Sequence, residues 1–132
     1  MDASTRKRVT DRARATCEYC GLPQSAVPAI RFHIEHVLAR QHGGKAEFQN
    51  LALACPNCNW HKGPNISGLD PDTGRIEQLF NPRTQNWTEH FELAGIEIRG
   101  LTAVGRATAH LLRFNTPERC DVRRELSRKK GP

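Results

Sequence analysis

Apolar and polar residues alternate from Ala29 to Val37, and this period of two predicts a strand. Gly43-Gly44 marks a turn after it. The apolar run from Phe48 to Ala54 leads into a pair of cysteines, and a short helix is expected to begin near Asn59. The central part of the chain therefore combines extended and helical segments.

The two ends of the chain are mostly helical in pattern. A basic helix is predicted from Ser4 to Ala15, with Ser4 as its N-cap. Further helices are expected over residues 102–114 and from Thr116-Pro117 to Arg128, the latter with Thr116 as N-cap. Between the central part and these helices, we expect a strand over 75–80 and a hairpin whose arms, 90–93 and 97–100, flank Ala94-Gly95. The chain is thus predicted to be α+β, with flanking N- and C-terminal helices.

The chain has 132 residues, which suits one domain, and only 37% of them are hydrophobic. Such a small, weakly apolar domain usually needs a metal ion or disulfides for stability. No apolar run approaches the roughly 18–20 residues of a membrane span, so a transmembrane protein is excluded. The polar, basic stretch Met1 to Thr16 does not resemble a secretory signal, and we expect a cytoplasmic protein.

Positive charge is concentrated at the two ends of the chain. There are 20 Lys and Arg against 14 Asp and Glu, a formal net charge of +6. Residues 1–20 and 101–132 carry the excess, while residues 21–100 are nearly neutral. A basic balance of this size is typical of nucleic-acid binders, although many basic proteins bind nothing acidic. The basic residues of the first helix could face solvent or contact DNA.

Cysteine spacing points to a metal site. Cys17 and Cys20 form one C-x-x-C pair, and Cys55 and Cys58 form a second. A redox site needs only one such pair, and a reducing compartment disfavours structural disulfides, so four thiolates around one structural Zn²⁺ are the preferred interpretation. Disulfides or free thiols are the alternative. Cys120 is expected to be a small buried apolar side chain.

The residues between and after these cysteines resemble the HNH endonuclease family. The similarity rests on Phe32-His-Ile-Glu-His-Val-Leu-Ala-Arg-Gln-His-Gly-Gly44 and Asn50-Leu-Ala-Leu-Ala-Cys-Pro-Asn-Cys-Asn-Trp-His-Lys-Gly63, and it covers about residues 17–63. It implies a ββα-metal finger: a hairpin and a helix around one catalytic divalent ion, braced by the zinc. Residues 75–126 also resemble the tail of small stand-alone bacterial HNH proteins, through Leu79-Phe-Asn-Pro-Arg83, Gly100-Leu-Thr-Ala-Val-Gly-Arg106 and Pro117-Glu-Arg119.

The resemblance assigns a role to each motif residue. His36 falls on the general base, and Asn50 on the residue that orients this base and braces the loop. Glu35 and Asn59 fall on ligands of the catalytic ion, for which their oxygen atoms suit Mg²⁺ or Mn²⁺. Two departures are the Asn at position 59, where the family's last His stands, and Ala39, where Pro is frequent.

Several of these assignments have alternatives. Asn59 could instead cap a helix. His61 is either a surface residue or an accessory contact, Arg40 either a solvated charge or a clamp on the scissile phosphate, and Lys62 either a phosphate contact or an ordinary helix-end residue. Neighbouring strand residues point to opposite faces, so Glu35 and His36 can serve one centre only if the strand ends or bends there.

The sequence therefore predicts one HNH nuclease domain over 1–132, with a zinc-braced core at 17–63 and a C-terminal hairpin and helical extension at 75–128. The expected activity is metal-dependent hydrolysis of phosphodiester bonds in DNA, with His36 activating water. The alternative is a zinc-braced nucleic-acid-binding module without catalysis. No membrane partner is expected, and the sequence leaves the oligomeric state and the site preference open.

Overall fold

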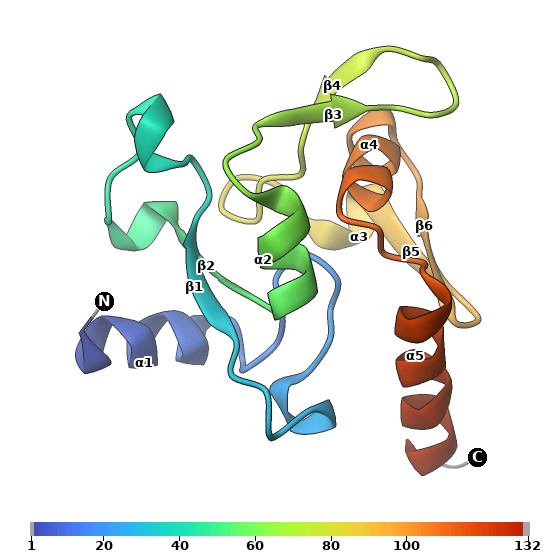
Figure 1. Cartoon of the computed structure of the whole chain (residues 1–132), viewed down its shortest axis with the longest axis horizontal. Coiled ribbons are helices and arrows are strands. Elements are labelled where there is room, and N and C mark those ends of the chain that lie inside the picture. Colours follow the sequence, from blue (N-terminus) through green and yellow to red (C-terminus); the bar gives the residue numbers. More distant parts are fainter. Residues whose placement is uncertain (1, 131–132) are drawn as a thin grey trace.

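A computed structural model describes residues 2–130 of the chain. Its centre is an antiparallel hairpin of β1 (His33–His36) and β2 (Leu51–Ala54), followed at once by helix α2 (Pro56–Lys62). Helix α2 packs against both strands, and Figure 1 shows it in green beside them. This order of two antiparallel strands and a helix is the ββα core that the resemblance implied. The α+β prediction is confirmed.

Helix α2 begins earlier than the sequence suggested. Cys55 is its N-cap, because the Cys55 sulfur accepts a hydrogen bond from the Cys58 amide at 3.5 Å, and Pro56 occupies the first helical position. Asn59 therefore lies inside the helix. The alternative interpretation of Asn59 as a helix cap is wrong.

Helix α1 (Ala3–Arg12) lies against the hairpin and contacts β2. Asp2, rather than the predicted Ser4, is its N-cap and accepts from the Thr5 amide at 2.7 Å. The Arg12 guanidinium lies 3.8 Å from the centre of the Phe48 ring and donates to the Phe48 carbonyl at 2.7 Å. Arg6 likewise donates to the Phe32 carbonyl. These two basic residues thus attach α1 to the core of the protein.

The second half of the chain folds around helix α4 (Ala103–Leu111), which packs on the hairpin of β3 (Ser67–Leu69) and β4 (Ile76–Gln78) and on strand β6 (Glu97–Gly100). Strand β6 pairs with β5 (Phe91–Ala94), which follows the short helix α3 (Trp87–His90). Helix α5 (Pro117–Lys130) extends away from this group (Figure 1). Short 3₁₀ turns occupy Gln24–Ala26, Arg40–His42 and Phe48–Asn50.

Apart from the start of α2 and the cap of α1, the local predictions differ from the structure in two places. The predicted strand over 29–37 is shorter, because only His33–His36 pairs with β2. Strand β3 lies in a stretch for which no strand was predicted. Thr102 caps α4 through the Gly105 amide at 3.0 Å, and Thr116 accepts from the Arg119 amide at 3.3 Å at the start of α5.

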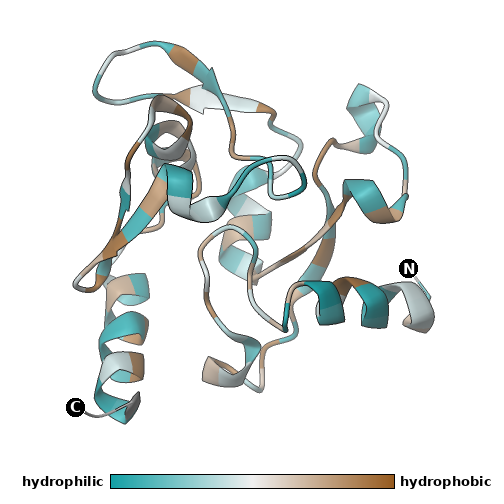
Figure 2. Ribbon diagram, turned by 180° about the vertical axis from the view of Figure 1, so that it is seen from behind, coloured by the Kyte–Doolittle hydropathy of each residue, from teal (hydrophilic) through white to brown (hydrophobic). Residues whose placement is uncertain are grey.

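One core connects both halves. Its largest buried side chains come from the loop that carries Cys17 and Cys20, from the central hairpin and its flanks, and from the C-terminal elements: Tyr19, Phe32, Leu51, Leu53, Phe91, Leu112 and Phe114. Figure 2 shows the contrast between the largely hydrophilic α1 and α5 and the more hydrophobic β1 and β2. Among the described residues no helix has the length and apolar character needed to cross a bilayer.

Candidate metal and catalytic site

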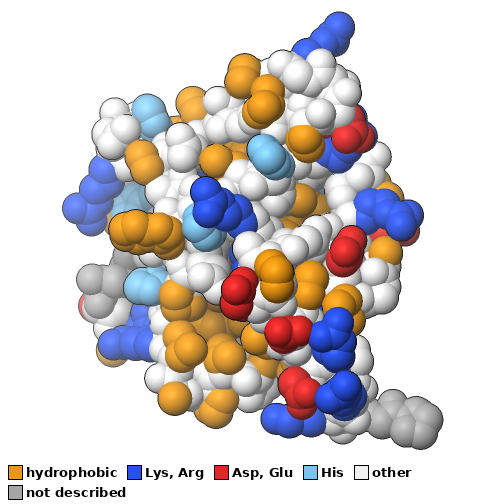
Figure 3. Space-filling model, turned by 45° about the vertical axis from the view of Figure 1, so that its right-hand side comes forward, with side chains coloured by type: hydrophobic (Ala, Val, Ile, Leu, Met, Phe, Trp, Pro, Cys, Tyr) orange, Lys and Arg blue, Asp and Glu red, His pale blue; other side chains and the backbone are white. Residues whose placement is uncertain are grey.

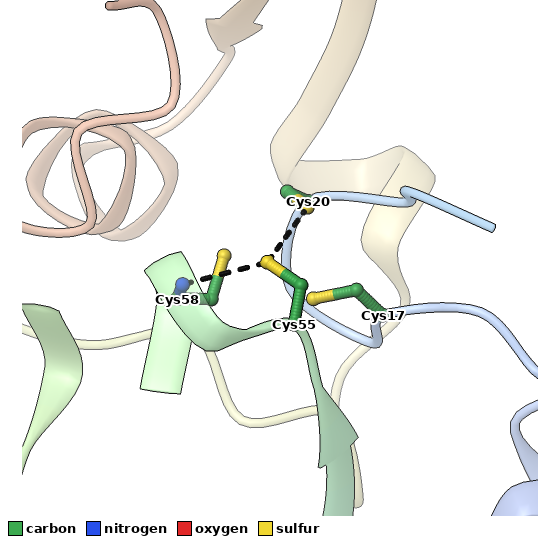
Figure 4. A group of neighbouring side chains, drawn as sticks. All are labelled: Cys17, Cys20, Cys55 and Cys58. Atoms are coloured by element: carbon green, nitrogen blue, oxygen red, sulfur yellow. Dashed lines mark hydrogen bonds between the residues drawn. The ribbon is translucent and has the colours of Figure 1, made fainter. Parts of the chain in front are cut away.

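The four predicted zinc ligands come together. Cys17 and Cys20 lie on the loop between α1 and β1, whereas Cys55 and Cys58 lie at the start of α2. All four are buried, and their sulfur atoms lie within 4.8 Å of one another. Figure 4 shows the sulfurs converging from the two segments. Four thiols in this arrangement fit a tetrahedral Zn²⁺ site, which also explains why so many thiols are buried together without disulfides.

Arg119 of α5 compensates the negative charge of this cluster. Its Nη2 lies 3.0 Å from the Cys58 sulfur and 3.8 Å from the Cys55 sulfur, and its Nη1 donates to the Leu112 carbonyl at 2.7 Å. Burial by itself lowers the pKa of Arg119, but the neighbouring thiolates of Cys58 and Cys20 raise it overall. Arg119 therefore attaches the C-terminal helix to the four-cysteine cluster as a permanent cation.

Glu35 and His36 point to opposite sides of β1, as regular strand geometry requires. Glu35 faces the interior and is only 6% exposed, whereas His36 is half-buried at the strand end. One Glu35 oxygen accepts from the Tyr19 hydroxyl. The other oxygen lies 3.4 Å from the Lys62 ammonium nitrogen. The strand ends at His36, so the two side chains remain near one edge of the hairpin.

Lys62 is the residue that joins these groups. Its ammonium nitrogen donates to the Val37 carbonyl at 3.0 Å and to the His36 carbonyl at 3.4 Å, besides pairing with Glu35. Lys62 is 2% exposed. The prediction that Lys62 touches DNA phosphate is therefore wrong for this structure, because a buried, fully paired ammonium does not face a ligand. The Lys62 nitrogen instead marks a position for a cation between Glu35 and the end of β1.

Burial and charge act in opposite directions at Glu35. Burial raises the pKa of the Glu35 carboxyl above its ordinary value, while Lys62 and the Tyr19 hydroxyl oppose that rise. The carboxylate thus depends on a nearby cation to remain charged in the interior. A lysine supplies that cation here.

His36 has two properties that suit a proton acceptor: an unpaired ring nitrogen and a lowered pKa. Its Nε2 is buried and has no hydrogen-bond partner among the described residues. Its pKa is lowered, first by burial and then by the positive charges of Arg40 and Lys62. The imidazole is therefore neutral at pH 7, the form that accepts a proton. An unpaired buried nitrogen also costs free energy, which a bound water or ligand would recover.

Asn50 braces the loop after β1. Its side-chain amide donates to the carbonyls of Leu38 and Lys45, each at 2.9 Å, and its side-chain oxygen accepts from the Leu38 amide at 2.9 Å. The Asn50 carbonyl also accepts from the Val37 amide at 2.8 Å. These four bonds fix the backbone directly after His36. The hydrogen bonds of the Asn50 side chain therefore go to the main chain, and none of them goes to the His36 imidazole.

Within the described part of the chain, no hydrogen bond joins the side chains of Glu35 and His36 to the remaining predicted residues, which are Asn59, Arg40 and His61. Asn59 is half-buried, and its side chain makes no hydrogen bond within residues 2–130. Arg40 is exposed and close enough to His36 to lower its pKa. His61 lies instead on the side of α2 that faces Arg113 and Arg119, whose charges add to burial in lowering its pKa. His61 is therefore not grouped with Glu35.

Comparison with known proteins identifies the central part of the chain. Residues 17–65 match the family model described as HNH endonuclease. This match spans both cysteine pairs, β1, β2 and α2, so this part of the chain is similar to an HNH domain of the nuclease type, and it carries a four-cysteine cluster suited to zinc. No curated protein and no solved structure matches the chain.

Sequence reasoning missed two parts of the site. Tyr19 stands between Cys17 and Cys20, where only the two metal ligands were expected to matter, yet its hydroxyl donates a hydrogen bond to Glu35. Arg119 belongs to the stretch Pro117-Glu-Arg119, which resembles the tail of small stand-alone bacterial HNH proteins but carried no predicted role. Neither role has a local signal, because both depend on contacts over 16 and 61 residues of sequence separation.

Proposed function

We propose that this protein is a metal-dependent endonuclease that hydrolyses phosphodiester bonds in DNA, with His36 as the general base. The observation that carries the proposal is the state of His36 within an HNH core. Its imidazole is neutral, has an unpaired buried nitrogen, and is attached to a backbone that Asn50 holds in place. Such a base takes a proton from water as the water attacks phosphorus, and contributes typically 10²–10⁴ in rate.

Carboxylate and amide oxygens are the donors that a hard divalent ion prefers. The Glu35 carboxylate and the free side-chain amide of Asn59 would hold Mg²⁺ or Mn²⁺, with water completing the shell. When bound, the ion would stabilise the charge that develops on the phosphoryl oxygens. Lys62 occupies the place of a cation beside Glu35, so we propose that it compensates the carboxylate whenever the ion is absent.

DNA contacts are proposed for Arg40 and His61. Arg40 is exposed, and its positive charge contributes to lowering the pKa of His36, which supports a role for its guanidinium in binding a phosphate near His36. His61, on the side of α2 that faces Arg113 and Arg119, would contact the DNA backbone away from Glu35. On the face drawn in Figure 3, acidic side chains lie mostly in the centre and right of the view. The net charge of +6 favours binding of a polyanion overall.

One observation favours the alternative, a nucleic-acid-binding module without catalysis. The Glu35 carboxylate already has two partners, Tyr19 and Lys62. If these contacts persist when Mg²⁺ or Mn²⁺ is supplied, the ion lacks its anionic ligand and the domain binds DNA without cutting it. The two functions therefore differ in whether Glu35 can exchange Lys62 for a divalent ion.

A plasmid-nicking assay decides between them. Zinc-loaded wild-type protein is incubated with supercoiled plasmid over a titration of Mg²⁺ and Mn²⁺, and EDTA is added to parallel reactions. We expect nicking that needs the added ion and falls by about 10²–10⁴ in His36→Ala. His110→Ala, which removes an exposed histidine on α4, is the matched control and should cleave normally. DNA binding by wild type without nicking at any ion concentration would establish the alternative.

A further inference from the structure

Trp60 is the most exposed of the large apolar side chains that the structure describes, at 81%. It lies on α2, directly after Asn59. Successive helical residues are separated by about 100°, so Trp60, two residues from both Cys58 and Lys62, points away from the buried side of the helix. Folding gains nothing from this indole, although it is among the costliest of side chains to leave in water.

The surroundings of Trp60 suit a nucleobase. The residues three positions before and after it, Asn57 and Gly63, carry no large apolar side chain, so the helix itself adds no apolar neighbour to the indole. The segment 48–69, which contains the whole of α2, has no Asp or Glu to repel a phosphate backbone. An isolated aromatic ring with hydrogen-bonding neighbours and no acidic groups is typical of single-strand-binding surfaces, where rings stack on bases.

We propose that Trp60 stacks on a nucleobase of the bound strand and so directs the protein to DNA with accessible bases. In a fully paired duplex each base face is covered by its neighbours, and a ring can reach one only if a base step opens at a cost of a few kcal/mol. Single-stranded, bulged or nicked DNA presents base faces without that cost. This inference rests on the proposed function for its ligand, DNA, but it does not require cleavage.

The test measures binding without added Mg²⁺ or Mn²⁺, so that no cleavage occurs. Fluorescently labelled oligonucleotides of one sequence are prepared as a single strand, a bulged duplex and a perfect duplex, and affinities are measured by anisotropy. Wild type should bind the first two more tightly than the perfect duplex. Trp60→Ala should lose about 5- to 150-fold in affinity for the single strand and bulged duplex, and Trp60→Phe should retain most of it.

A control variant and a second readout make the result specific to Trp60. Ile76→Ala removes another exposed apolar side chain, 68% exposed on the β3–β4 hairpin, and should bind as wild type. Intrinsic fluorescence provides a direct readout, because Trp87 is the only other tryptophan and its indole is already bonded to the Tyr19 carbonyl at 2.8 Å. DNA should quench the fluorescence of wild type, and this quenching should be absent from Trp60→Phe.

The outcomes separate this inference from the proposed function. If wild type binds DNA but Trp60→Ala binds all three oligonucleotides within twofold of wild type, the stacking role is wrong and the nuclease proposal is unaffected. If Trp60→Ala changes the oligomeric state in gel filtration while DNA affinity is unchanged, the indole covers a protein surface and the inference is also wrong. If wild type binds none of the oligonucleotides, the proposed function fails and the ligand of this inference fails with it.

Discussion

The buried pair of Lys62 and Glu35 gives the most quantitative prediction. The charged atoms are 3.4 Å apart, and the side chains are 3% and 5% exposed. At an effective dielectric constant of about 20, two unit charges at this distance attract by about 5 kcal/mol. Lys62→Met keeps the apolar stem but removes the ammonium, and leaves the carboxylate with the Tyr19 hydroxyl alone. We expect a loss of about 3–5 kcal/mol in the free energy of unfolding, the usual cost of breaking a buried pair.

Urea denaturation of the zinc-loaded protein measures this loss. Glu35→Gln in combination with Lys62→Met removes both charges, and we expect the double variant to recover a large part of the stability that Lys62→Met loses. A Lys62→Met variant whose free energy of unfolding lies within about 1 kcal/mol of wild type would refute the argument. That result would mean that Glu35 is neutral or solvated in the folded protein.

The same variant tests the proposed ion site without an activity assay. In Lys62→Met the carboxylate has lost its internal cation, so Mn²⁺ or Mg²⁺ should raise the unfolding temperature more than it does in wild type. A ligand at a hundred times its dissociation constant stabilises the folded state by about 2.7 kcal/mol. Glu35→Gln combined with Lys62→Met should show no such gain. Equal responses in all three proteins would exclude Glu35 as a ligand.

Three further predictions concern zinc and pH. Cys58→Ala should be unfolded or insoluble, because structural zinc is worth about 10–16 kcal/mol in small metal-folded peptides; folded, zinc-free Cys58→Ala, shown by elemental analysis and circular dichroism, would contradict this. Burial lowers the pKa of His36, so the acidic limb of the single-turnover rate should lie below the ordinary pKa of about 6.5; a limb at or above that pH would argue against His36 as the base. Hydrogen bonds from Arg106 lower the pKa of Asp70 to about 2, so this pair stabilises the fold above about pH 4 and ceases to do so as pH falls toward 2. Asp70→Asn should therefore flatten the acid-unfolding curve in that range. An unchanged curve would mean that Asp70 does not contribute to the pH dependence of stability.

Much of the fold and the zinc cluster could be predicted because their signals are local. The two C-x-x-C pairs predict four metal ligands. A single metal ion would bring the pairs together whatever path the intervening loop takes. The Ala94-Gly95 turn and the Thr116-Pro117 helix start each depend on a few neighbouring residues. Asn50 was expected to orient His36 and brace the loop, and its side chain bonds to the carbonyls of Leu38 and Lys45.

The candidate catalytic site depended more on tertiary structure. The alternation of a strand predicts that Glu35 and His36 diverge, but only the packing of Tyr19 and α2 decides that Glu35 faces the interior. A lysine at the end of a short helix normally reaches solvent, and nothing near Lys62 in sequence reveals that a carboxylate 27 residues earlier will bury it. The type of a side chain determines what chemistry it can perform. The partner that the fold places beside it determines whether the side chain is available to a ligand or is paired within the core.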